Sequence, residues 1–302
     1  MTTTTTSPAP SLTLGGRTSL RRRLTNNAAT IGVSIAFLLA LVPLVSLVWT
    51  AIKNGAERLS WDFLTTDMVG VFGDMTSGGI LHALVGTLLV TLAAGVISVP
   101  VGILTAIYLV EYGRGGRLAR WITFFVDVMT GIPSIVAGLF AVAVFTLTVG
   151  PAYRAGIMGA VALSLLMTPV VIRSIEEMLR LVPNELREAA LALGVPRWLV
   201  IVKVVLRTAI AGIITGVMLA VARVIGETAP LLLTVGLATQ TNTDLFDGRM
   251  ATLPVFAYRQ YAQGGVGVSR AWAAALVLIV VVMLLNLAAR LVSRFFAPKV
   301  GR

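Results

Sequence analysis

Six long apolar stretches, separated by shorter polar segments, constrain this chain more than any other feature of its sequence. A helix needs about 20 apolar residues to cross a bilayer, and each stretch is long enough to do so. Hydrophobic residues make up 57% of the 302 residues and charged residues only 12%, a balance far from that of soluble domains. The sequence therefore predicts an all-α membrane protein with six transmembrane helices. The stretches cover residues 31–52, 80–110, 122–149, 156–179, 208–237 and 271–291.

Five of the six stretches contain an internal proline, at Pro43, Pro100, Pro133, Pro169 and Pro230. A proline removes one backbone donor and bends its helix, which membrane proteins tolerate where neighbouring groups satisfy the freed carbonyl. Together these prolines predict a bundle of bent helices around an interior, as transporters use.

Small residues recur at every fourth position in the fifth stretch, at Gly212, Gly216 and Ala220. This spacing lets the backbones of two helices approach each other closely. We therefore expect the fifth helix to pack against another helix through this face.

The positive charge of the chain follows the alternation of its loops. The net charge is +11, and sixteen of the 24 lysines and arginines lie in the two tails and in the loops that would share one side of the membrane. Six lie in the loops of the opposite side. Since basic loops stay in the cytoplasm, we expect both termini to be cytoplasmic. The basic excess is then a topology signal and does not indicate nucleic-acid binding.

The first 26 residues are rich in threonine and then basic. This composition predicts a disordered cytoplasmic tail over residues 1–26, in which Arg21, Arg22 and Arg23 can contact anionic membrane lipid. A transmembrane domain is expected over residues 27–302.

The longest polar interruption between apolar stretches is the segment 180–207, on the predicted cytoplasmic side. Asn184 can cap a helix there, Glu185 and Glu188 suit the positive end of its dipole, and Gly194 supplies a stop. The helix has about nine residues, whereas about 12–15 are needed for stability alone in water. Another part of this protein or of a partner must therefore hold it.

The middle of this short helix, at Ala189 and Ala190, offers a surface of small side chains. One interpretation is a loop that folds back on the helices of the chain itself. The other is a projection that docks into a partner protein.

Several kinds of chemistry are excluded by the residues that the sequence lacks. It has no cysteine and a single histidine, His82, which we expect at the membrane interface at the start of the second stretch. The basic turn at 113–117 lacks the lysine and hydroxyl residue of a P-loop. We therefore predict no metal, no cofactor and no enzymatic activity; if the chain uses ATP, another protein hydrolyses it.

Of the charges within the apolar stretches, Arg173, Arg223 and Glu227 matter most for function. A charge at the bilayer centre costs about 2.5–3.5 kcal/mol on insertion scales, so such residues usually face the bundle interior and mark a pathway. Arg223 and Glu227 are four residues apart and can pair on one helix face, either as a structural ion pair or as part of a site. Glu176 and Glu177 lie within reach of Arg173.

Two arginines and one acid leave a net positive interior, which suits an oxyanion because guanidinium matches phosphate and carboxylate geometry. Gly226 and Pro230 weaken the helix beside Arg223, and the Thr228 hydroxyl can bond a carbonyl that Pro230 frees. Asp127, near the start of the third stretch, is expected at the interface, where it caps backbone groups.

The run ARVIGETAPLL at 222–232 resembles the signature of the PstA family, the permease subunits of bacterial phosphate ABC importers. The runs VIRS at 171–174 and GIPSIV at 131–136 are similar to that family too, and the resemblance covers residues 26–296.

The run Glu188-Ala189-Ala190 followed by Gly194 resembles the coupling loop of ABC-importer permeases, whose short helix inserts into the ATPase subunit. In that loop a Leu-Pro pair usually follows, whereas this chain has Leu206-Arg207. The resemblance predicts a type I, MetI-like importer permease in the inner membrane.

The resemblance also implies partners: a second permease similar to PstC, an ATPase similar to PstB and a phosphate-binding protein similar to PstS. It implies a phosphate pathway at Arg173, Arg223, Glu227 and Thr228, and ATPase coupling through Glu185, Glu188, Ala189, Ala190 and Gly194. Three other hypotheses stay open: a permease for another oxyanion, a stand-alone secondary anion transporter and, least favoured by the residues, a membrane enzyme.

Overall fold

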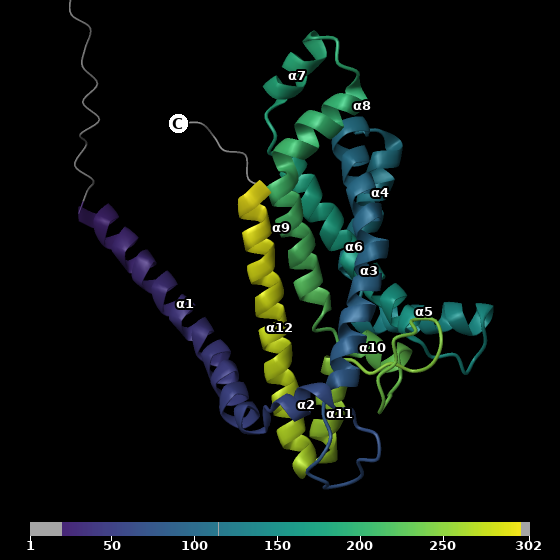
Figure 1. Cartoon of the computed structure of the whole chain (residues 1–302). Coiled ribbons are helices and arrows are strands. Elements are labelled where there is room, and N and C mark those ends of the chain that lie inside the picture. The colour runs from purple at the N-terminus through teal and green to yellow at the C-terminus, as the bar shows by residue number, and fades with distance from the viewer. Residues whose placement is uncertain (1–19, 114, 297–302) are drawn as a thin grey trace, which may run out of the picture. The chain divides into compact units, whose positions relative to one another are not determined.

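The computed structural model describes residues 20–113 and 115–296, in which all regular elements are helices (Figure 1). The chain divides into two compact units after Thr50. The first unit consists of helix α1 (Leu20–Gly55) as far as Thr50. Its sides carry apolar residues all the way round from about Ile31, which is typical of a membrane span. Residues 20–26 of the expected disordered tail are helical, and residues 1–19 lie outside the described part.

The second unit is organised around helix α6 (Gly156–Arg180), which contacts five other helices. These are α3 (Leu81–Ile107), α4 (Arg117–Thr130), α5 (Ser134–Thr148), α9 (Leu206–Val224) and α10 (Ala229–Thr234). Leu163, Met167, Val171 and Ile175 of α6 are fully buried in the larger of two hydrophobic clusters. Helix α6 is thus the centre of this bundle.

Helix α9 packs closely on α6 through its small residues. A Cβ atom added to Gly216 would lie 2.7 Å from the Cβ of Ser174, and one added to Gly212 would lie 2.3 Å from the sulfur of Met178. The predicted close approach of the fifth span to another helix is therefore confirmed.

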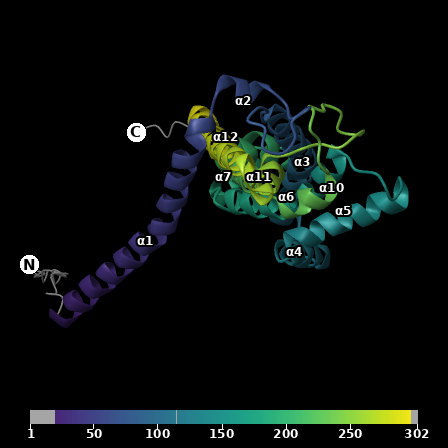
Figure 2. The ribbon, with the colours of Figure 1, turned by 90° about the horizontal axis from the view of Figure 1, so that it is seen from below.

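The third apolar stretch forms two helices instead of one. Helices α4 and α5 meet at an angle of 107° across residues 131–133. Pro133 directly precedes α5, and without an N–H it cannot continue the hydrogen-bond ladder of α4. Figure 2 shows α5 leading away from α4 along the side of the bundle where α10 lies. The described residues thus hold five helices long enough to span a membrane, or six if the bent pair is one span.

The fifth stretch begins earlier and ends earlier than expected. Its helix starts at Arg197 and runs through α8 (Arg197–Val200), a π-helical turn η3 (Ile201–Val205) and α9. The backbone leaves the helix after Val224 and resumes with α10, so the stretch 208–237 is interrupted where Gly226 and Pro230 were expected to weaken it. Pro230 lies in the first turn of α10, where its missing N–H would have no helical partner in any case.

Two short helices and the start of α12 (Val266–Phe296) form the end of the bundle opposite α7 (Asn184–Ala192) (Figure 1). These short helices are α2 (Trp61–Thr65) and α11 (Leu253–Gln263), which enclose the second hydrophobic cluster with the start of α3. His82 is buried there, with its ring edge-on to Phe256 and its Nδ1 3.7 Å from the carboxylate of Asp67. Helix α11 covers this turn of α3, and the interfacial position expected for His82 stays a prediction.

Candidate functional site

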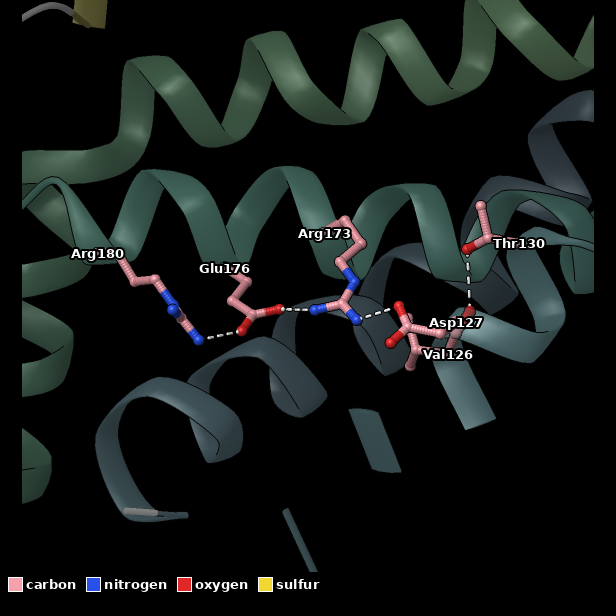
Figure 3. A network of polar contacts seen from close by, with 6 residues as sticks. All are labelled: Val126, Asp127, Thr130, Arg173, Glu176 and Arg180. Atoms are coloured by element: carbon pink, nitrogen blue, oxygen red, sulfur yellow. Dashed lines mark hydrogen bonds and ion pairs between the residues drawn. The ribbon is translucent and has the colours of Figure 1, made fainter. Parts of the chain in front are cut away.

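Arg173 of α6 lies at the centre of a chain of four charges (Figure 3). Its Nη1 donates to Oε2 of Glu176 at 2.8 Å, and its Nη2 donates to the carboxylate of Asp127 on α4. Oε1 of Glu176 accepts a further bond from Nη2 of Arg180 at 2.6 Å. The expected pairing of Arg173 with Glu176 is confirmed, whereas Glu177 is exposed.

Asp127 therefore joins α4 to α6, and the expectation that it only caps backbone groups is wrong. The face of α4 that carries Asp127 turns toward α6 because α4 packs on α6 directly. The two arginines and two carboxylates balance in charge. An oxyanion that approached Arg173 would have to compete with Asp127.

The two carboxylates that hold Arg173 differ in how far the rest of the chain covers them. The side chain of Glu176 is 6% exposed and that of Asp127 is 61% exposed, with Arg173 between them at 32%. Glu176 is thus a buried anchor for the guanidinium. The bond to Asp127 lies on the open side, where a charged ligand could replace it.

Arg223, Glu227 and Thr228 lie around the break between α9 and α10. Residues 225–228 are not helical, so Arg223 and Glu227 do not share a helix face, and no ion pair joins them among the residues that the structure describes. The predicted pair is therefore wrong. The Thr228 hydroxyl bonds no freed carbonyl in the described residues, since Pro230 begins a helix and frees none.

The two intramembrane arginines lie at different depths of the bundle. Gly216 of α9 packs against Ser174, the neighbour of Arg173. Arg223 follows Gly216 by seven residues, which places it about 10 Å further along the axis of α9 at 1.5 Å per residue. The structure brings Arg173 to Asp127 and Glu176, but it does not bring Arg173 and Arg223 into contact.

Helix α7 has the nine residues that the sequence predicts, and Gly194 ends it with a positive φ of 77°. Asn184 is the first residue of the helix and not its cap, because Pro183 occupies the capping position. Glu185, Glu188 and Ala189 are exposed, while Ala190 packs against the larger hydrophobic cluster. Helix α7 thus lies against the bundle on one side, and its other side is exposed.

Arg187, within the predicted coupling segment, is a residue whose role sequence reasoning missed. Its guanidinium reaches back into the bundle and binds Glu111, which lies in a π-helical turn η2 (Tyr108–Tyr112) at the end of α3. The two residues are 76 positions apart. An isolated acid at the end of an apolar stretch was the only available signal, because burying a charge requires a partner.

Residues 98–302 match the model of the family described as the binding-protein-dependent transport system inner membrane component. The chain belongs to this family. This permease is 47% identical over 285 residues to the phosphate transport system permease protein PstA 1 of Mycobacterium tuberculosis, covering 93% of the chain and 92% of the relative. It is 40% identical over 271 residues to PstA of Pasteurella multocida, covering 88% and 94%.

Solved structures share the fold of this permease. A chain of a bacterial alginate ABC transporter in complex with its periplasmic protein superposes with a TM-score of 0.63 at 15% identity, over 92% of this chain and 96% of that one. A chain of the MetNI methionine ABC transporter gives 0.57 at 20% identity, over 72% and 94%. The permease therefore has the MetI-like ABC importer fold and is a multi-pass protein of the inner membrane. Its family is one of transport subunits and not of enzymes.

Proposed function

We propose that this chain is the PstA-type permease subunit of an ATP-driven phosphate importer. The observation that carries the proposal is its identity of 39–47% over about nine-tenths of its length to several proteins named as phosphate transport permeases. Its network at Arg173 supports the same conclusion, because it offers a guanidinium with one exchangeable carboxylate to an oxyanion. We place both termini in the cytoplasm, following the distribution of basic residues.

Phosphate would pass the two arginines one after the other. Arg223 stands at the break after α9, about two helical turns along the axis from the level of Arg173. Glu227 and Thr228 line the same break, and Glu227 limits the positive charge there. Arg173, already held by Asp127 and Glu176, would bind the ion weakly enough to release it.

A separate ATPase would drive the transport. Exposed α7 carries Glu185, Glu188 and Ala189 on its free side and would dock into that ATPase. A second permease subunit would complete the pathway beside α5, and a phosphate-binding protein would deliver the ion at the opposite end of the bundle. The match to the binding-protein-dependent family supports this assembly.

Phosphate uptake tests the pathway directly. In cells that lack other phosphate importers, Arg173→Gln should lower uptake from micromolar phosphate by about tenfold to a hundredfold, since one charge-assisted hydrogen bond contributes about 1.5–3 kcal/mol. Arg290→Gln, at an exposed site on α12, is the matched control and should leave uptake unchanged. Normal uptake in cells without this chain would contradict the proposal, and loss of sulfate uptake alone would identify another oxyanion.

Docking of the ATPase has its own test. The chain should co-purify with a P-loop ATPase, and Glu188→Lys should abolish the stimulation of that ATPase while the complex stays folded. If the purified chain alone moved phosphate down an ion gradient, it would instead be a secondary transporter.

A further inference from the structure

We propose that Glu111 and the two arginines that hold it, Arg187 and Arg197, form a buried clamp that makes α7 and the end of α3 move as one body. We call these three residues the Glu111 clamp. Its role rests on the proposed function, in which α7 receives the motion of an ATPase. Within that function Glu111 and Arg187 are positioning residues: they touch neither phosphate nor ATP, and they set the coupling between ATP hydrolysis and transport.

Arg187 uses its whole guanidinium to attach α7 to the bundle. Its Nε and Nη2 donate to Oε1 of Glu111 at 3.0 and 2.9 Å. Nη2 also donates to the carbonyl of Leu179 at 2.8 Å, and Nη1 donates to the carbonyl of Val182. One side chain of α7 thereby binds the end of α3, the last turn of α6 and the segment that follows α6.

Arg197 attaches the other side of the Gly194 turn to the same point. Its Nη2 donates to the backbone carbonyl of Glu111, and its guanidinium lies 5.1 Å from the ring centre of Tyr112. The segments before and after Gly194 are thus bound to adjacent residues of η2. Figure 1 shows α7 and α8 at the end of the bundle where α3 terminates.

Glu111 is buried and Arg187 is largely covered, whereas most of α7 is exposed. The side chains of Arg187 and Glu111 are 15% and 8% exposed, and α7 contains no fully buried residue. A nine-residue helix does not hold its position by itself. Because a charge pair that is shielded from water separates only at high cost, the clamp resists opening when α7 is pulled or pushed.

The position of Glu111 suits a point of force transfer. It lies in the π-helical turn η2, a type of helix defect that is frequent at functional sites. Helix α3 packs along α6, and α6 carries Arg173. A displacement of α7 would therefore reach α3 through Glu111, and it would reach α6, which carries Arg173, through the carbonyl of Leu179.

The importer reconstituted with its ATPase and binding protein tests this role through the number of phosphate ions transported per ATP. Arg187→Met alone leaves Glu111 buried without a partner and can prevent folding. The double variant Glu111→Gln with Arg187→Met removes both charges, so it should fold and bind the ATPase. We expect its phosphate-to-ATP ratio to fall about threefold or more. Arg290→Met, which removes a charge from exposed α12 at the same end of the bundle, should keep the wild-type ratio.

The outcomes separate the two proposals. A wild-type complex that transports no phosphate would contradict the proposed function. A double variant that assembles and keeps the wild-type ratio would overturn the clamp. If the double variant fails to assemble, the single variant Glu111→Gln takes its place, and a wild-type phosphate-to-ATP ratio in it would overturn the clamp. This variant should assemble, because Arg187 keeps its bonds to the carbonyls of Leu179 and Val182.

A distance measurement tests the clamp without any activity. The chain has no cysteine, so two introduced cysteines are unique in it. Spin labels at Leu104→Cys on α3 and Leu193→Cys at the end of α7 occupy exposed sites. Their distance distribution should be the same with and without ATP, and it should broaden in the double variant. A shift on ATP binding larger than the width of the distribution would show that α7 moves independently of α3.

Discussion

Arg187 and Arg173 each join a carboxylate on another helix, yet they do so in different surroundings. The side chains of the Arg187–Glu111 pair are only 15% and 8% exposed. The Arg173–Asp127 pair has one partner almost two-thirds exposed. Enclosure makes the first pair a permanent attachment, since water cannot replace either partner. Exposure lets another anion replace Asp127 at Arg173, which the proposed passage of phosphate requires. Under that proposal, burial and not the ion pair itself separates a structural contact from a binding site.

The largest expected effect contrasts these two arginines. Arg187→Met should lower the free energy of unfolding by about 3–5 kcal/mol, because it leaves the Glu111 carboxylate buried without a counter-charge. Arg173→Met should cost about 1 kcal/mol or less, since Glu176 keeps Arg180 and Asp127 gains water. The free energy of unfolding of each purified variant can be measured in detergent by titration with SDS. Equal losses would show that the difference in burial has no energetic consequence.

A second prediction concerns the buried anchor of the exchangeable site. Glu176→Gln should lower stability by about 1.5–3 kcal/mol, because the carboxylate accepts bonds from Arg173 and Arg180 at once. Glu177→Gln is the matched control on the next residue, which is exposed and should change stability very little. The same SDS titration applies. If Glu177→Gln were the more damaging change, Glu176 would not be the anchor.

A third prediction concerns the turn that the Glu111 clamp holds from both sides. Gly194→Ala should cost about 1 kcal/mol from backbone strain alone, because φ is 77° and the space around the glycine is open. Gly95→Ala on α3 also meets open space but has ordinary helical φ, so it should not destabilise the protein. Thermal unfolding of both variants tests this, and a loss for Gly95→Ala as large as that for Gly194→Ala would argue against strain as the cause.

The smallest expected effect on stability comes from replacing Asp127, the exposed partner of Arg173. Asp127→Asn should change stability by less than about 1 kcal/mol. It should strengthen phosphate binding to the purified importer by about twofold to fivefold, since it removes the competitor for Arg173. Equilibrium dialysis with labelled phosphate, in the absence of the binding protein, gives the affinity. Unchanged or weaker binding would mean that Asp127 does not occupy the position of the anion.

The sequence predicted the helical membrane fold and the short helix α7 because both depend on local patterns. Pro133 predicted the bend between α4 and α5, but not its angle of 107°. Hydropathy could not reveal the break at 225–228, since an apolar run stays apolar whether its helix continues or not. Gly226 and Pro230 did indicate a weak helix. Whether such a segment bends or separates into two helices is decided by its neighbours, here the close packing of Gly138 against Pro230.

The site was predictable only as far as contacts were local. The Arg173–Glu176 pair follows from a spacing of three residues on one helix. Asp127 lies 46 residues from Arg173, and Glu111 lies 76 from Arg187. Such contacts depend on how each helix is rotated about its axis, which a single sequence does not specify. The predicted Arg223–Glu227 pair is wrong although its spacing is local. Residues four apart meet only within one helix, and α9 ends at Val224, between the two.

The wide turn η2 makes the attachment of α7 depend on residue count. A regular helix advances about 100° per residue. Deleting one residue before Glu111 in the span would rotate its carboxylate by about that angle around the axis, away from Arg187, without altering the composition of the span. The length of this helix is therefore as strictly determined as its chemistry, and homologous spans that differ by a single residue should carry the acid at a shifted position or lack the arginine.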